Sequence, residues 1–272
     1  MIQRIIPSTN ESLPVIGLGT WKTFDAAEDK YPTLRKVLDE MHNAGGSLVD
    51  SSPMYGRAEE VIGEITGDVN NQDSLFYATK VWTTGKMEGI RQMESSLKKM
   101  KRSVMDLIQV HNLIDWKTHL KTLQRWKEEG TVRYVGITHY TDSMHAELER
   151  VLINEKIDFV QFNYSILSRN AEERLLPAAE SNGVATLINR PFGEGSMFQI
   201  VKGKPLPSWA RELEITNWGS FFLKYIIAHP AVTCVIPATG NPEHAAENFK
   251  SALGNLPDRA IRKKMVEYIS SL

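Results

Sequence analysis

The chain has 272 residues, of which 42% are hydrophobic and 24% charged, with a formal net charge of −1 and a single cysteine. This length suits one α/β barrel, and the composition is that of a globular protein with a sizeable core. The near-zero net charge argues against nucleic acid or an anionic membrane as a partner, and one cysteine excludes an intramolecular disulfide framework.

Neither a targeting segment nor a membrane-spanning segment is predicted. Proline and polar residues interrupt the apolar N-terminus before a signal-peptide core can form. The most hydrophobic later segment, 221–236, contains Lys224, His229 and Pro230, which do not suit a transmembrane helix. We therefore expect a soluble, cytoplasmic protein.

The chain opens with a predicted β-hairpin over 2–14 and then alternates short apolar runs with amphipathic helical patterns. The β-like runs are 15–20, 48–50, 75–80, 106–111, 132–138, 159–163, 185–189 and 234–237. The helical patterns are 31–44, 57–65, 86–101, 116–129, 142–154, 172–182, 217–228 and 258–271.

Strands that alternate with helices pair in parallel, because each helical crossover returns the chain to the same end of the sheet. Eight such units in roughly 250 residues favour a closed (β/α)8 TIM barrel over an open doubly wound sheet. No linker or low-complexity segment interrupts the pattern, so residues 1–272 are predicted to form a single domain. The long interval 190–231 is expected to pass over the rim of the seventh strand.

Polar residues follow the second, third and fourth strands at the end of the barrel where the chemistry of this fold takes place. Asp50, Lys80 and His111 end these runs, and Tyr55 follows the acid by five residues. One such residue alone would be interpreted as the first polar position beyond a buried strand. An acid, a cation and an imidazole from three consecutive strands, with a phenol beside the acid, indicate a functional site.

The chemistry of these side chains suits proton transfer to an oxygen. A nearby ammonium lowers the pKa of a phenol, and Lys80 is expected to act on Tyr55 in this way. Asp50 would keep Lys80 charged and positioned, while His111 would hydrogen-bond a substrate oxygen. Such a site protonates an oxygen as it becomes an alkoxide, which is required when hydride is added to a carbonyl carbon.

With these residues the sequence resembles the aldo-keto reductases. The family's Asp, Tyr, Lys and His tetrad matches Asp50, Tyr55, Lys80 and His111, and the Gly-Leu-Gly-Thr-Trp segment at 17–21 also matches. The resemblance covers essentially the whole chain. It implies a metal-free reductase that uses NADPH or NADH to convert aldehydes or ketones to alcohols with Tyr55 as general acid.

The resemblance also implies which residues bind the nicotinamide cofactor. Thr138 and His139 take the place of a serine and an asparagine after the fifth strand, and Gln161 matches a glutamine in the sixth. Asn189 stands where an aromatic residue often stacks on the nicotinamide. The implied set is Gly19, Thr20, Trp21, Thr138, His139, Gln161, Asn189, Arg190, Phe192, Thr239, His244, Glu247 and Asn248.

Near the C-terminus, the segment 236–244 corresponds to the one that grips the adenosine 2′-phosphate in this family. Glu247 and Asn248 match the pair that holds the adenine, whereas Ala238 and His244 replace a lysine and an arginine. The loss of these two fixed cations weakens the argument for a strict preference for NADPH. The short C-terminal tail lacks the long loop of many relatives, and we expect an open pocket.

Two alternatives to a reductase stay open at this point. A lysine at the end of a barrel strand is also the nucleophile of Schiff-base aldolases, which would give Lys80 another role. A regulatory subunit that binds the cofactor without catalysis is compatible with the altered residues Thr138, His139, Asn189 and Ala238. The expected partner is a small carbonyl substrate, without nucleic acid or membrane, and the protein is expected to be a monomer or a weak oligomer.

Overall fold

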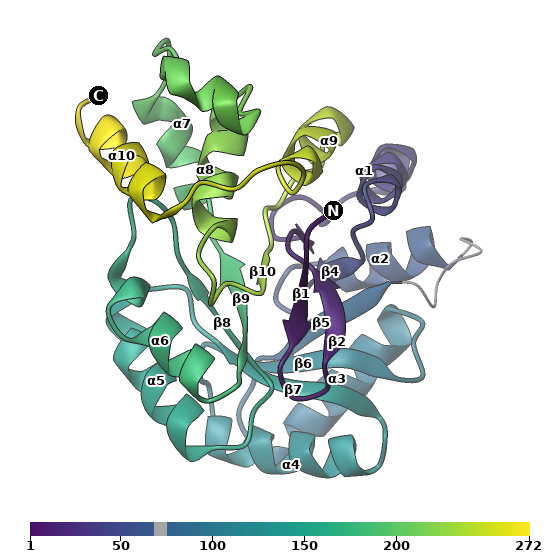
Figure 1. Cartoon of the computed structure of the whole chain (residues 1–272). Coiled ribbons are helices and arrows are strands. Elements are labelled where there is room, and N and C mark those ends of the chain that lie inside the picture. Colours follow the sequence, from purple (N-terminus) through teal and green to yellow (C-terminus); the bar gives the residue numbers. More distant parts are fainter. Residues whose placement is uncertain (68–74) are drawn as a thin grey trace.

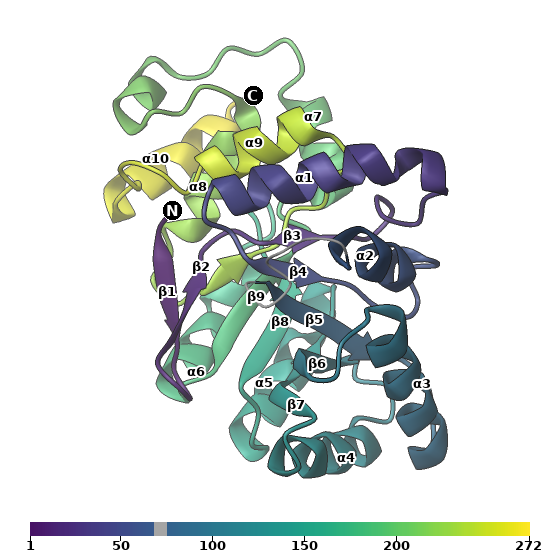
Figure 2. The same cartoon turned by 90° about the vertical axis from the view of Figure 1, so that its right-hand side faces the viewer.

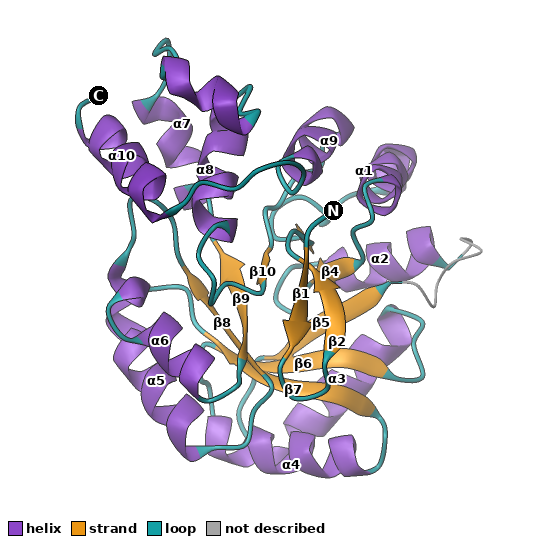
Figure 3. Ribbon diagram, in the orientation of Figure 1, coloured by secondary structure: helices purple, strands orange, loops and turns teal. Residues whose placement is uncertain are grey.

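The structure of the chain is a computed structural model that describes residues 1–67 and 75–272. Within these ranges eight parallel strands form a barrel surrounded by helices, which confirms the predicted fold (Figures 1 and 3). The strands are β3 (Leu18–Gly19), β4 (Leu48–Asp50), β5 (Phe76–Val81), β6 (Met105–His111), β7 (Val132–Thr138), β8 (Phe159–Asn163), β9 (Ala185–Asn189) and β10 (Cys234–Val235).

The strands lie in the sheet in the order of the chain, from β3 to β10. Backbone contacts between the segments of β3 and β10 join the two ends of the sheet. Ile16 forms a parallel bridge with Val235, and Gly19 forms another with Ala238. Gly19 is required there, because a Cβ atom would lie 2.8 Å from the carbonyl oxygen of Ile236. β3 and β10 are both shorter than the predicted runs 15–20 and 234–237.

The predicted hairpin is confirmed as β1 (Gln3–Ile6) paired antiparallel with β2 (Glu11–Pro14). Ile6 and Leu13 are buried in one apolar cluster with inward-facing strand residues such as Leu107. The hairpin therefore covers the N-terminal end of the barrel, where Tyr134, near the start of β7, hydrogen-bonds to its Glu11 at 2.6 Å. With this end filled, a cavity can open only towards the C-terminal ends of the strands.

Helices cover the outside of the barrel, and α1 lies beside α9 next to the junction of the first and last strands (Figure 2). They are α1 (Tyr31–Asn43), α2 (Ala58–Thr66), α3 (Lys86–Lys99), α4 (Trp116–Glu128), α5 (His145–Asn154), α6 (Leu175–Ser181), α7 (Ser196–Ile200), α8 (Trp218–Ile227), α9 (Pro242–Lys250) and α10 (Arg259–Ser270). Short 3-10 helices are η1 (Glu28–Lys30), η3 (Asp142–Met144), η4 (Asn170–Glu172), η5 (Gly193–Gly195) and η6 (Ser208–Leu213). Among the residues described, no helix has both the length and the apolar character needed to cross a membrane.

The helical elements differ from the prediction in four places. The patterns at 142–154 and 172–182 each begin as a 3-10 turn before the α-helix starts. The interval 190–231 contains α7 and η6 as well as the predicted α8. Helix α9 was not predicted; Asn241 caps it by accepting a hydrogen bond from the Glu243 amide at 2.8 Å.

Lys224, on α8, connects the end of η6 to the segment before α10. Its buried ammonium donates hydrogen bonds to the backbone oxygens of Leu213 (2.8 Å), Leu253 (2.9 Å) and Asn255 (3.0 Å). Lys224→Met would leave these oxygens without their donor, and we expect it to lower the free energy of unfolding by about 2–3 kcal/mol. Urea unfolding measures this, with exposed Lys263→Met as the control; equal losses in both variants would contradict it.

Candidate active site

The four predicted catalytic side chains lie together at the C-terminal end of the barrel. Asp50 and His111 end their strands, Lys80 precedes the last residue of β5, and Tyr55 lies in the loop before α2. The Lys80 Nζ atom lies 5.1 Å from the centre of the Tyr55 ring. The rings of Tyr55 and His111 meet edge to face, with centroids 5.9 Å apart. The four side chains that were predicted to meet at the strand ends therefore do lie close together.

A tight turn brings Tyr55 back over the end of the barrel. The Tyr55 amide donates to the backbone oxygen of Ser52 at 3.0 Å, and Gly56 follows with a φ of +60°. A Cβ atom on Gly56 would lie 2.4 Å from the Asp25 carboxyl group, so both the backbone angle and the space require glycine. The same carboxylate accepts a hydrogen bond from the Arg57 amide at 3.0 Å and fixes the start of α2.

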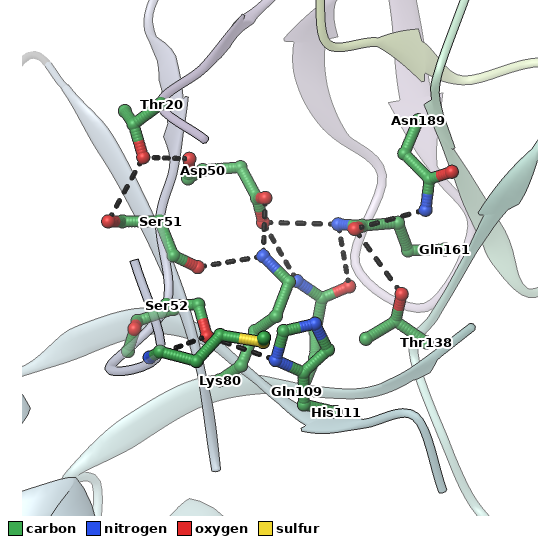
Figure 4. A network of polar contacts seen from close by, with 12 residues as sticks. Thr20, Asp50, Ser51, Ser52, Lys80, Gln109, His111, Thr138, Gln161 and Asn189 are labelled. Atoms are coloured by element: carbon green, nitrogen blue, oxygen red, sulfur yellow. Dashed lines mark hydrogen bonds and ion pairs between the residues drawn. The ribbon is translucent and has the colours of Figure 1, made fainter. Parts of the chain in front are cut away.

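Lys80, which lies against the Tyr55 ring, forms a buried ion pair with Asp50. Figure 4 shows the hydrogen bonds that surround this pair. The Lys80 Nζ atom is 2.5 Å from Asp50 Oδ2 and 2.7 Å from the Ser51 backbone oxygen. The other carboxylate oxygen, Asp50 Oδ1, accepts from the side-chain amides of Gln109 at 3.0 Å and Gln161 at 3.1 Å. A buried pair is tolerated when its remaining donors and acceptors are satisfied in this way.

Burial and the charges of this group together set the pKa values of Lys80 and Tyr55. Burial acts to lower the pKa of Lys80, but Asp50 and then Tyr55 raise it, and the net shift is upward. Burial raises the pKa of Tyr55 above its usual value and outweighs the lowering effect of the Lys80 ammonium. Lys80 thus lowers the pKa of Tyr55, as predicted, but burial determines the net upward shift. Tyr55 keeps its proton at neutral pH and can donate it.

His111 is neutral at physiological pH. Burial, followed by the charges of Lys80 and His139, lowers the pKa of His111 to about 2. Its Nδ1 atom lies 3.0 Å from the hydroxyl oxygen of Ser52. In the part of the chain that the structure describes, Nε2 has no hydrogen-bond partner, and the ring lines the cavity. One nitrogen of a neutral imidazole can donate and the other can accept.

These side chains border a cavity of about 610 Å³, a size usual for small-molecule sites. Tyr55, Asp50 and His111 form part of its wall, whereas Lys80 lies beneath it. The predicted cofactor residues on this wall are Gly19, Thr20, Trp21, Thr138, Gln161, Asn189, Arg190 and Phe192. Apolar side chains that the sequence analysis did not assign to the site also contribute, among them Met54, Trp82 and Phe198.

Five predicted cofactor residues do not line this cavity. The His139 ring stacks on Tyr140 with centroids 5.2 Å apart, and its Nδ1 atom accepts the Tyr140 amide at 3.0 Å. The residues at the proposed adenosine end lie at or near α9, beyond β10. These are Thr239, His244, Glu247 and Asn248.

Asn189 offers an acceptor that suits an amide ligand. Its Nδ2 atom donates to the His139 backbone oxygen at 3.2 Å and to Gln161 Oε1 at 3.4 Å, which fixes the orientation of the amide. Gln161 Oε1 also accepts from the Thr138 hydroxyl at 3.3 Å. The remaining Asn189 Oδ1 atom is buried and has no partner among the described residues. An unpaired buried acceptor at the cavity wall fits the carboxamide of a nicotinamide.

An ion pair joins two loops that border the cavity. Glu194, in the loop after β9, lies 3.4 Å from Lys22, in the loop after β3, and also pairs with Arg190. The Arg190 guanidinium lies over the Tyr140 ring, 4.4 Å from its centre. Lys22, Glu194 and Tyr140 all border the cavity. These three residues were not predicted, because nothing in the sequence shows that their loops are adjacent.

Gln109 and Ser52 were also missed, although the sequence carries a signal for Gln109. Successive residues of a strand alternate between its two faces, so Gln109 shares a face with His111, two positions later. A glutamine amide on the inward face of β6 has to find a partner inside the barrel, and it finds Asp50.

Comparison with known proteins points to one family. A family model described as "Aldo/keto reductase family" matches residues 15–264. The aldo-keto reductase YhdN of Bacillus subtilis is 26% identical over 194 residues, which cover 64% of this chain but only 56% of that protein. The methylglyoxal reductase YeaE of Escherichia coli is 24% identical, over 91% of this chain and 89% of its own length. The structure of an aldo-keto reductase from Klebsiella pneumoniae in complex with NADPH shares the fold, with a TM-score of 0.84 at 22% identity, over 99% of this chain and 96% of that one.

Proposed function

The chain belongs to the aldo/keto reductase family, and from this premise we propose that Tyr55 donates the proton when an aldehyde or ketone is reduced to an alcohol. The observation that carries the proposal is the placement of the buried Lys80–Asp50 pair beneath Tyr55 and beside neutral His111 at the cavity wall. NADPH is the proposed cofactor, with NADH as an accepted alternative.

A bound nicotinamide supplies the hydride, which adds to the carbonyl carbon. The carbonyl oxygen then gains negative charge and takes the phenolic proton of Tyr55, giving the alcohol. The Lys80 ammonium stabilises the resulting phenolate, and Asp50 keeps that ammonium charged and in place. His111 hydrogen-bonds the same substrate oxygen and stabilises its developing charge.

The cofactor is proposed to bind through residues of β7, β8 and β9 at one end, and of α9 and the loop before it at the other. The side-chain oxygen of Asn189, which is otherwise unpaired, would accept a hydrogen bond from the nicotinamide carboxamide. Thr138 and Gln161 lie next to it. At the adenosine end, Thr239, His244, Glu247 and Asn248 would contact the nucleotide. Because Ala238 and exposed His244 provide no permanent charge for a 2′-phosphate, we expect NADH to bind as well.

The proposed substrates are small carbonyl compounds. The relative from Escherichia coli is named a methylglyoxal reductase, so methylglyoxal is the first aldehyde to test. Trp21, Trp82 and Phe198 give the cavity apolar walls, which also favour aromatic aldehydes.

Titration with NADPH and NADH, followed through tryptophan fluorescence, tests cofactor binding first. A panel of aldehydes and ketones is then screened by the absorbance of the reduced cofactor. Turnover of at least one carbonyl is the expected result. Tight cofactor binding without turnover over the whole panel would instead favour a regulatory subunit.

A Schiff-base aldolase is disfavoured by the state of Lys80. A nucleophilic amine has to lose its proton, whereas Asp50 and Tyr55 raise the pKa of Lys80 and its three hydrogens face oxygen acceptors or the phenol. Borohydride trapping with a keto substrate should therefore give no covalent adduct at Lys80. Trapping of that residue would revive the aldolase.

The pH dependence of reduction should be set by Tyr55 and not by His111. Because the pKa of Tyr55 is raised, the phenol stays protonated through neutral pH, and kcat/KM is lost only as the pH rises through that pKa. The pKa of His111, lowered to about 2, gives no limb near its usual value of 6.5. We expect a flat profile from about pH 6 to 9; a loss of activity centred near 6.5 would contradict it.

A further inference from the structure

Ser52 lies two residues after Asp50; its backbone oxygen accepts the Tyr55 amide, and its side chain contacts His111. Its hydroxyl is fully buried, and its oxygen lies 3.0 Å from His111 Nδ1 (Figure 4). The same oxygen lies 3.4 Å from the Met54 backbone nitrogen, which donates to it. The residue therefore links the turn that carries Tyr55 to the imidazole on β6.

We propose that Ser52 is a positioning residue, which donates its hydroxyl proton to Nδ1 of His111 and so holds the imidazole with its own N–H at Nε2, facing the cavity. The proposal rests on the proposed function for its catalytic consequence. The hydrogen-bond assignment itself follows from the contacts of Ser52.

The direction of this hydrogen bond follows from what each atom can do. The Met54 amide can only donate, so the Ser52 oxygen accepts there, and its proton needs an acceptor elsewhere. Among the described residues, His111 Nδ1 is the one acceptor bonded to this hydroxyl. If Nδ1 carried the proton, the fully buried Ser52 proton would have no acceptor, which costs free energy.

The tautomer decides what His111 offers to a substrate. Because the ring is neutral, a proton at Nε2 leaves none at Nδ1, and Nε2 is the nitrogen without a protein partner. An N–H at that position donates to a carbonyl oxygen and strengthens as negative charge develops there. The opposite tautomer would direct a lone pair at the same oxygen and repel it.

Nitrogen-15 NMR of histidine-labelled protein tests the assignment without any turnover. The His111 resonances are identified by their loss in His111→Asn. We expect the unmodified chain to show an unprotonated Nδ1 and a protonated Nε2, and Ser52→Ala to show a mixture of tautomers. A protonated Nδ1 in the unmodified chain would overturn the proposal.

Kinetics then test the consequence. Ser52→Ala should lower kcat/KM for a carbonyl substrate by about tenfold, mostly through kcat, with the dissociation constant of NADPH within about twofold. Ser52→Thr keeps the hydroxyl and should restore most of the rate. Ser96→Ala removes another fully buried serine hydroxyl, on α3 outside the barrel, and should leave the rate unchanged.

The outcomes separate this proposal from the proposed function. A Ser52→Ala enzyme with an unchanged tautomer and unchanged kcat/KM would overturn the positioning role while leaving carbonyl reduction intact. Failure of Ser52→Thr to restore either the tautomer or the rate would also overturn it. If no carbonyl is reduced by the unmodified chain, the proposed function fails, and the NMR spectra still decide the tautomer.

Discussion

Tyr55→Phe is expected to lower kcat for carbonyl reduction by about 10³-fold, because it removes the proposed proton donor and little else. The ring would keep its contacts with Lys80 and His111, while the interaction of the hydroxyl with Lys80 would be lost together with the proton donor. The dissociation constant of NADPH should change by less than about twofold. Stopped-flow measurement of NADPH oxidation under single-turnover conditions gives the rate of the chemical step directly.

The matched control for this prediction is Tyr268→Phe. It removes the same atom from a tyrosine on α10 whose hydroxyl donates to the Pro205 backbone oxygen, away from the cavity. That variant should retain its full rate. A Tyr55→Phe enzyme that reduced a good aldehyde as fast as the unmodified chain would remove Tyr55 from the mechanism.

Lys80→Met is expected to damage both stability and activity. It would leave the Asp50 carboxylate buried beside two amides without its cation, and breaking a buried pair in this way costs about 3–5 kcal/mol of unfolding free energy. It would also remove the ammonium that stabilises the Tyr55 phenolate, so kcat should fall by about 10²–10³-fold. Urea unfolding and single-turnover rates measure the two effects separately.

The double variant Asp50→Asn/Lys80→Met separates these two roles of the pair. Without the carboxylate there is no unpaired buried charge, so the double variant should be more stable than Lys80→Met alone. Its activity should stay low, because the ammonium is still missing. Recovery of the rate together with the stability would show that Lys80 acts only through folding.

The arrangement of the proposed catalytic residues was predictable because it depends on strand ends. The runs 48–50, 132–138, 159–163 and 185–189 match the bounds of their strands. In a parallel barrel all strand ends point the same way, so Asp50, Lys80 and His111 had to converge. The bounds of β3 and β10 were less predictable: their contact with each other includes isolated bridges of Ile16 with Val235 and of Gly19 with Ala238, which apolar runs do not show.

Contacts between loops, and the degree of burial, could not be predicted from the sequence. The net pKa shift of Tyr55 depends on how deeply the ring is buried, which outweighs the charge of Lys80. The pairing of Lys22 with Glu194 joins residues far apart in the chain. Helix α9 was not predicted, although Asn241 and Pro242 are typical of a helix start.

The hairpin formed by β1 and β2 has a kinetic consequence for the opposite end of the barrel. Because apolar side chains and the hairpin fill the N-terminal end, both reactants have to use the mouth at the strand ends. The acceptor on Asn189 and the amide of Gln161 lie on the wall of this one cavity, together with Tyr55. We therefore expect the reactant that binds deeper in this cavity to arrive first and to depart last.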